Sequence, residues 1–236
     1  MQKLLIATAC VAVGVFVGLG LANAKPRANV LPMVNGTSYE SGDWDWKDTD
    51  KGSVSGTISY APRASRRPMV VYLVRVDAEN KPTTQGKFNA PSTLVVSQKG
   101  AKFKPSFAVL QTGQKVEFKN DEEKEIAHNV YFLGVEDLDL GIFEQRESVT
   151  HTFTKSGSVS VHCSVHKRMD GKFFVAPTPA YALVMKAGKS FEIKDVPFGR
   201  YILKTWQKQK RFKDITDLVV EVTKGQTTKA SVAMKR

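Results

Sequence analysis

Residues 158–169 read SVSVHCSVHKRM, and they decide how the rest of the chain is interpreted. The first half alternates apolar residues with Ser and His, so a strand would turn its valines and Cys163 toward one apolar face. The second half places His166 and Met169 at intervals of three residues after this cysteine. A short loop can therefore bring the cysteine, histidine and methionine side chains to one point.

An upstream run of the same kind begins at His128, which shares a strand face with Val130 and Phe132. His128 and Cys163, on two different strands, are thus both predicted to point toward an apolar interior. Two imidazoles, one thiolate and one weakly bound thioether are the donor set of a blue copper site. The sulfur donors favour Cu(I) and the imidazoles suit Cu(II), so such a site moves one electron with little rearrangement.

Other interpretations of these residues carry less weight. A lone buried cysteine is usually a small core residue, and a lone methionine usually fills space. A zinc site would use more Cys or His and no axial Met, and a binuclear copper centre would need a second cysteine. His162 alternates outward from Cys163 and is expected on the strand surface, and His151 is expected as an edge histidine with its own partner.

Several motifs together resemble the cupredoxins, the plastocyanin and amicyanin group of type 1 copper proteins. They are HNVYF at 128–132, FTKSGSVSVHCSVHKRM at 153–169, GKFFV at 171–175 and the strand-like TGQKVEFKN at 112–120. The Cys-x-x-His-x-x-Met spacing is similar to the short ligand loop of amicyanin. The resemblance covers roughly residues 93–177 and implies a Greek-key β-sandwich.

This resemblance implies one type 1 copper ion with three equatorial ligands and one axial ligand, which are His128, Cys163, His166 and Met169. It also implies that Asn129 ties the two ligand loops together by pairing with Ser164. His166 would then present its ring edge near the surface, where the electron leaves.

The composition fits an all-β globular protein. The 236 residues are 42% hydrophobic and 25% charged, which excludes collagen, coiled coils and wholesale disorder. Short β-branched and aromatic runs alternate with turn residues, and no long helical periodicity competes with them. Clear examples of predicted strands are 69–76, 115–119, 158–163, 200–206 and 217–222.

Turn-rich segments at 80–92 and 176–180 bracket a middle domain, predicted at 88–178. This domain has 11 Lys+Arg and 11 Asp+Glu, whereas the whole chain has a net charge of +12. The basic excess therefore lies in the flanks.

The flanking segments resemble a second β-sandwich. GSVSGTI at 52–58 and SFEIKDVPFGRY at 190–201 are similar to strands of carboxypeptidase-regulatory-like, or prealbumin-like, sandwiches. Neither flank has enough strands for its own core, so 51–80 and 181–236 are predicted to form one discontinuous domain. Residues 25–50 would be an arm, ordered by its tryptophans. The combined arrangement resembles bacterial proteins called methylamine-utilisation or plastocyanin-like.

The N-terminus predicts export. An apolar run at 4–21 is followed by Ala22-Asn23-Ala24, so residues 1–24 are interpreted as a secretory signal peptide, with an uncleaved membrane anchor as the alternative. The expected location is the bacterial periplasm. After cleavage only Cys163 remains, and it must be a free thiol, an intermolecular bridge or a metal ligand.

The expected function is a periplasmic electron carrier with a protein redox partner, such as a c-type cytochrome or an oxidoreductase. The alternatives are copper binding for delivery, or an interaction module without electron transfer. The basic stretch 208–213 is either a docking surface for an acidic protein or membrane face, or a solvated loop. The acidic run 121–125 is expected to be a solvated turn.

Other function classes find no support in the sequence. It has no Ser-His-Asp order, P-loop or G-x-G-x-x-G after a strand, so we do not expect an enzyme. No recognisable nucleic-acid motif accompanies the positive charge, so we do not expect a nucleic-acid partner either.

Overall fold

The computed structural model describes residues 30–34, 37–40, 44–59, 67–185, 189–208 and 218–233. The predicted signal peptide and residues 209–213 of the basic stretch lie outside this part of the chain. Within it, the regular structure is all strand apart from one 3-10 turn, η1 (Trp46–Asp48), so the all-β prediction is confirmed. The described residues contain no helix with the length and apolar character that a bilayer crossing requires.

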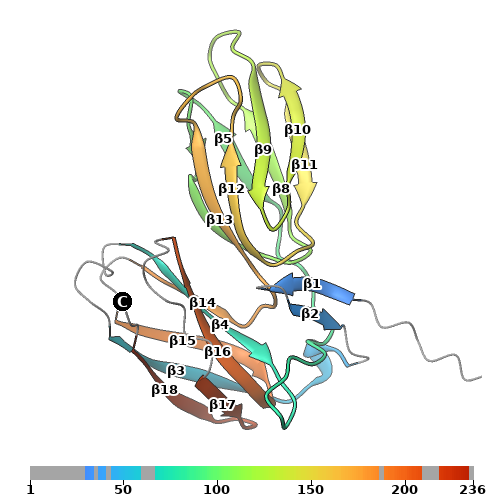
Figure 1. The fold of residues 1–236 in the computed structure, drawn as a ribbon, viewed down its shortest axis with the longest axis vertical. Coiled ribbons are helices and arrows are strands. Elements are labelled where there is room, and N and C mark those ends of the chain that lie inside the picture. The colour runs from blue at the N-terminus through green and yellow to red at the C-terminus, as the bar shows by residue number, and fades with distance from the viewer. Residues whose placement is uncertain are drawn as a thin grey trace, which may run out of the picture.

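The middle of the chain supplies nine strands to one sandwich, the upper body in Figure 1. They are β5 (Leu94–Gln98), β6 (Phe103–Lys104), β7 (Phe107–Gln111), β8 (Lys115–Asn120), β9 (His128–Gly134), β10 (Leu138–Phe143), β11 (Ser148–Thr152), β12 (Gly157–His162) and β13 (Asp170–Ala176). One sheet has the order β10-β9-β12-β13-β7 and the other β11-β8-β5-β6. Two of the pairings, β13 with β7 and β5 with β8, are parallel.

Alternating side chains hold the two sheets of this middle sandwich together. β8 and β12 bury every second residue, as their sequence pattern predicts. Phe118 from one sheet contacts Phe132 and Phe173 from the other, with ring centroids 5.8 and 6.3 Å apart. Each such ring contributes about 2 to 3 kcal/mol by leaving water. The apolar face of β12 continues to Cys163, which belongs to the same core cluster.

Both ends of the chain contribute to a second sandwich, the lower body in Figure 1. Its strands are β3 (Lys51–Ser59), β4 (Met69–Arg75), β14 (Tyr181–Val184), β15 (Ser190–Pro197), β16 (Gly199–Gln207), β17 (Leu218–Val222) and β18 (Thr227–Ala233). They form two sheets, β14-β4-β16-β17 and β15-β3-β18. In both sheets, strands that precede the middle sandwich therefore pair with strands that follow it.

The segment before β3 is fastened to the second sandwich by its tryptophans. A hairpin of β1 (Val30–Val34) and β2 (Thr37–Glu40) precedes it. Trp46 is buried, and its Nε1 donates a hydrogen bond of 2.7 Å to the carbonyl oxygen of Gln85. Trp44 stacks on Trp46, and the guanidinium of Arg75 lies 4.5 Å from the Trp44 ring. These contacts explain why two tryptophans predict an ordered arm.

An aromatic contact joins the two sandwiches. Trp206 of β16 stacks with both Phe107 of β7 and Phe174 of β13, with ring centroids 6.3 and 4.9 Å away. Tyr72 of β4 lies 5.2 Å from the same Phe174 ring. The rings of Tyr72, Phe174 and Trp206 and neighbouring apolar residues from β4 and β13 form a core cluster of their own. The second sandwich is therefore packed directly against one sheet of the middle sandwich.

Candidate metal centre

Strand pairing brings His128 and Cys163, the first two predicted metal ligands along the chain, close together. β9 and β12 are antiparallel neighbours, so the residue that begins β9 lies at the same end of the sheet as the residue that follows β12. His128 begins β9 and Cys163 follows β12 directly, one residue beyond the strand that the alternation predicts to include it. This end of the middle sandwich points away from the second sandwich (Figure 1). We call it the metal end.

The cysteine sulfur lies between two imidazole nitrogens. Cys163 Sγ is 3.9 Å from His128 Nδ1 and 3.8 Å from His166 Nδ1, and the three ligand atoms lie within 4.8 Å of one another. Sulfur and nitrogen ligands of one ion, each about 2.0 to 2.3 Å from it, are separated by no more than about 4.3 Å. Both sulfur-to-nitrogen distances satisfy this limit, so the Cys163 sulfur can share one metal ion with either imidazole.

The loop after Cys163 is curled by its own backbone. The Cys163 N–H donates to the carbonyl oxygen of Met169, and the Met169 N–H donates to that of His166, both at 3.2 Å. Met169 is buried and belongs to the same core cluster as Cys163. The thioether is thus held on the inner side of the loop, while His166 is only half-buried.

Asn129 of β9 connects this loop to β10. Its Oδ1 accepts a hydrogen bond of 3.1 Å from the backbone N–H of Ser164, which is the pairing that the family resemblance implies. Its Nδ2 donates to Asp139 Oδ1 and to the carbonyl oxygen of Gly141, at 2.6 and 2.9 Å. Its own backbone N–H donates to Cys163 Sγ at 3.4 Å. This one residue therefore positions both the sulfur and the loop that carries His166.

Glu122 is an unexpected member of the site, because the acidic run 121–125 was expected to be a solvated turn. Its side chain is only 10% exposed, and its Oε1 lies 3.1 Å from His128 Nε2. The same oxygen accepts a hydrogen bond from the N–H of Ala101. A proton on Nε2 would complete this hydrogen bond and leave the Nδ1 lone pair facing the sulfur. For Glu122, the solvated-turn expectation is wrong.

Burial and hydrogen bonding favour a neutral His128 ring and an ionised Glu122 carboxylate. Burial lowers the pKa of the His128 imidazole despite its contact with Glu122, so the ring is neutral near pH 7. Burial alone would raise the pKa of the Glu122 carboxyl, but hydrogen bonds from Ala101 and Gly100 and from the His128 ring lower it instead. A neutral imidazole beside a carboxylate is a good metal ligand.

The other described histidines have separate partners. His151 Nε2 lies 2.6 Å from Glu136 Oε2, and the His162 ring stacks on Tyr131 at 5.2 Å. Within the part of the chain that the structure describes, the only cluster of His, Cys, Asp and Glu side chains able to hold a metal ion is that of His128, Cys163 and His166.

A two-sheet β-sandwich with Cys, two His and a buried Met gathered at one end decides the fold type of the domain. The middle sandwich is cupredoxin-like. No protein-family profile matches the chain, and no well-characterised protein sequence matches it either.

Solved structures similar to this chain include cupredoxins. A purple cupredoxin from Nitrosopumilus maritimus is 18% identical over 35% of this chain and 99% of that chain, with a TM-score of 0.33. The reduced state of an amicyanin mutant is 26% identical over 35% of this chain and 81% of that chain, with a TM-score of 0.32. A Cu(I) structure of another amicyanin mutant is 25% identical with the same coverage and TM-score.

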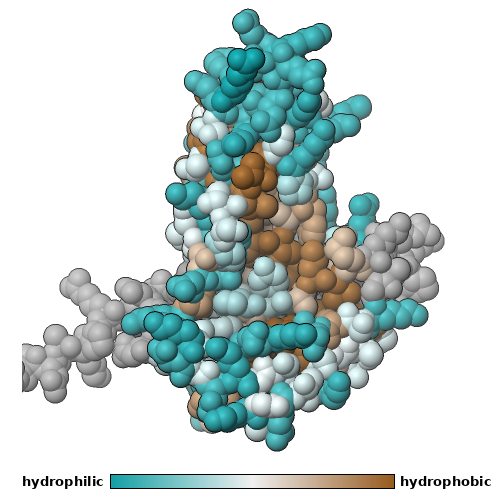
Figure 2. Space-filling model, turned by 180° about the vertical axis from the view of Figure 1, so that it is seen from behind, coloured by the Kyte–Doolittle hydropathy of each residue, from teal (hydrophilic) through white to brown (hydrophobic). Residues whose placement is uncertain are grey.

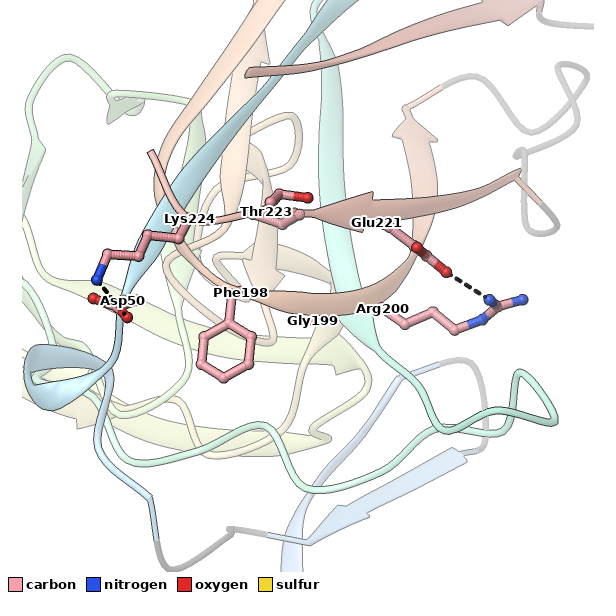
Figure 3. Close-up of a pocket in the computed structure, with 8 residues that line it drawn as sticks. Asp50, Phe198, Gly199, Arg200, Glu221, Thr223 and Lys224 are labelled. Carbon is pink, nitrogen blue, oxygen red and sulfur yellow. Dashed lines mark hydrogen bonds and ion pairs between the residues drawn. The ribbon is translucent and has the colours of Figure 1, made fainter. Parts of the chain in front are cut away.

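A pocket of about 470 Å³ is lined by residues of the second sandwich and by Asp50 (Figure 3). Its charged side chains are paired with one another. Lys224 Nζ lies 3.0 Å from Asp50 Oδ2, and Arg200 Nη1 lies 2.9 Å from Glu221 Oε1. The half-exposed ring of Phe198 lies between the two pairs. The four charged side chains of the lining therefore add up to no net formal charge.

Proposed function

We propose that the cupredoxin domain holds one type 1 copper ion and carries single electrons between protein partners. The observation that supports this most is the position of Cys163 Sγ, 3.9 and 3.8 Å from the Nδ1 atoms of His128 and His166. A bound copper ion would supply the one-electron couple. His128, Cys163, His166 and Met169 would hold it.

The surrounding residues favour electron transfer because they restrain the ligands. Glu122 orients the His128 ring, and Asn129 fixes both Cys163 Sγ and the loop that carries His166. Ligands that are already in place need little rearrangement when the charge of a site changes. His128 and Cys163 are buried, whereas His166 is half-buried, so the His166 ring is the natural contact with a partner.

We also propose that the protein works in the periplasm. The apolar N-terminal run and its Ala-x-Ala sequence support export to the periplasm. A protein there that carries electrons would exchange them with a c-type cytochrome or an oxidoreductase, and would itself not be an enzyme.

The test is a titration of the metal-free protein with Cu(II), followed by optical and EPR spectroscopy. We expect one equivalent of copper to produce an intense visible thiolate-to-copper absorption and a single type 1 EPR signal. Cys163→Ser should abolish the colour, whereas His162→Ala, which changes a histidine outside the cluster, should retain it. A wild-type protein that stays colourless, or a coloured Cys163→Ser variant, would refute the proposal.

Copper delivery is the alternative to electron transfer, and exchange rates separate the two. Burial of His128 and Cys163 predicts slow exchange, because a chelator can contact these two ligands only after the loop opens. We therefore expect the copper-loaded protein to keep its colour for hours in excess chelator and to give a reversible one-electron voltammogram. Loss of copper within minutes, without reversible voltammetry, would favour delivery.

A further inference from the structure

A basic pocket of about 400 Å³ lies beside the cluster of His128, Cys163 and His166. It is lined by residues 102–106 together with Arg168 and Asp170. The last two residues flank Met169, so the pocket wall is part of the loop that would hold the metal. Its cationic side chains are those of Lys102, Lys104 and Arg168, and all three residues are exposed.

These three cations have no carboxylate partner. Across the described residues, no ion pair within 4.0 Å involves Lys102, Lys104 or Arg168. Asp170 is the one carboxylate in the pocket wall, so the pocket keeps a net positive charge. The pocket of the second sandwich differs, because its charges are paired with one another. Unpaired like charges that converge on a concave surface attract anions.

The neighbouring surface of the metal end has the opposite sign. The loop 121–125 carries four acidic residues and one lysine, and it contacts the β5–β6 turn just before Lys102. Lys99 of that turn already pairs with Glu123 at 2.6 Å. Acidic and basic regions therefore lie next to each other, and a partner with the complementary arrangement would bind in one orientation.

The metal end is hydrophilic in the space-filling view from behind, and teal side chains cover the upper part of the molecule (Figure 2). Val165 is a half-exposed apolar residue in the ligand loop, beside His166. Ile142 of β10, which pairs with Asn129, is another exposed apolar residue at this end, so charged and apolar side chains share the surface.

We propose that the basic pocket formed by Lys102, Lys104 and Arg168 receives acidic side chains that project from the protein redox partner. This interaction would place the partner's redox centre beside the half-buried His166. The inference rests on the proposed electron-transfer function and adds to it the chemistry of the partner surface, which must be acidic where it meets this pocket.

The first test measures binding without metal, so it does not depend on the copper site. The isotope-labelled, metal-free protein is titrated with a peptide of ten glutamates and followed by NMR. We expect shifts concentrated at residues 102–106 and 168–170, weakened by salt. The double variant Lys104→Glu/Arg168→Glu should bind about tenfold more weakly. The matched control, Lys81→Glu/Lys115→Glu, makes the same charge change at exposed lysines outside the pocket and should bind as wild type does.

Three outcomes would overturn this proposal. They are shifts centred elsewhere, an equal loss of affinity in the control variant, and binding of inorganic phosphate as tight as that of the peptide. The last outcome would make the pocket a site for small anions rather than for a protein surface.

The second test links the pocket to electron transfer in the copper-loaded, reduced protein. Two oxidants that each remove one electron are compared, anionic hexacyanoferrate(III) and cationic tris(phenanthroline)cobalt(III). The pocket variant should slow the anionic oxidant several-fold and not slow the cationic one. Peptide binding without this difference would overturn the docking role. If the protein binds no copper, the proposed function fails, while the peptide titration still decides whether the pocket recognises acidic chains.

Discussion

Asn129 uses both ends of its side-chain amide at the metal end. The oxygen accepts from the backbone of Ser164, and the nitrogen donates to Asp139 and Gly141 of β10. A buried residue with several hydrogen bonds is hard to replace, because each buried group left unpaired costs about 1 to 3 kcal/mol.

We predict that Asn129→Ala binds copper about 10- to 100-fold more weakly than the wild type and lowers the free energy of unfolding. The loop would lose its connection to β10, and its ligands would move more freely. Ser164→Ala should have little effect, because the donor to Asn129 is the Ser164 backbone N–H rather than its hydroxyl. Competitive copper titrations of both variants check this, and equal losses would contradict it.

The limits of sequence reasoning are clearest at Glu122 and Asp139. The order of Cys, His and Met could be predicted, because donor type and spacing are local properties. The Asp139 contact could not, since β10 has an irregular register against β9 between Asp139 and Ile142. Glu122 lies in a run of charged residues that favours a solvated turn, and its inward position depends on the distant backbone of Ala101.

The pair of Glu136 and His151 gives the stability of the protein a specific pH dependence. Glu136 also accepts hydrogen bonds from the N–H groups of Thr154 and Lys155. Burial would raise the pKa of the Glu136 carboxyl, but His151 and these N–H groups lower it below the ordinary 4.5. A carboxyl with a lowered folded pKa stabilises the protein above its unfolded pKa, and this contribution is lost as pH falls through the folded value.

We therefore predict that Glu136→Gln destabilises the metal-free protein by about 1 to 3 kcal/mol at pH 7. The difference from wild type should shrink as pH falls below 4.5, where the wild-type carboxyl begins to take up its proton. Urea unfolding of both proteins between pH 7 and pH 3 measures this. Glu221→Gln removes an exposed ion pair and should cost less than about 1 kcal/mol throughout. A constant difference for Glu136→Gln at all pH values would contradict the prediction.

At the scale of single elements, the strands of the middle sandwich follow their sequence pattern closely. The predicted strand 115–119 differs from β8 by one residue at one end, and the predicted strand 158–163 differs from β12 by one residue at each end. Their alternation reports which face is buried, and that face positions Cys163. Which strands pair is harder to predict from the sequence, because pairing depends on how closely two backbones can approach, as Gly134 of β9 approaches β12. A Cβ on Gly134 would lie 2.2 Å from the carbonyl oxygen of Ser158.

Two glycines of this sheet allow a matched comparison. Gly134 has a φ of 138° and Gly141 a φ of 86°, but a Cβ on Gly141 would meet nothing within 4 Å. We predict that Gly134→Ala lowers the free energy of unfolding by about 3 kcal/mol, from the clash and the backbone strain together. Gly141→Ala should cost about 1 kcal/mol, from strain alone. Chemical denaturation checks both values, and equal costs would show that the strand approach is not the cause.

At the scale of the whole molecule, charge balance and turn composition distinguish the middle of the chain from its flanks. The contact between the two sandwiches is not predictable in this way. Phe107, Phe174 and Trp206 point outward from their own sheets, and an outward aromatic residue on a strand looks like a surface residue in the sequence. Only the three-dimensional arrangement shows that they stack on one another.

We predict that Trp206→Ala uncouples the unfolding of the two sandwiches. Loss of the half-buried indole should cost about 2 kcal/mol and give two thermal transitions, or a broader one, in calorimetry. The copper spectrum should keep its type 1 character, because Trp206 is not a member of the cluster of His128, Cys163 and His166. Trp44→Ala removes a tryptophan that stacks within the second sandwich and its arm, and it should not separate the transitions. Unchanged cooperativity in Trp206→Ala would contradict the coupling.

The packing of Trp206 also fixes the direction in which the metal end faces. The second sandwich packs against one sheet of the middle sandwich, and the metal end points away from it (Figure 1). If the second sandwich were attached to a solid support, the ligand loops would therefore face the solution. Immobilising the protein through the second sandwich would thus give a layer of uniformly oriented molecules, each with His166 accessible to freely diffusing reagents.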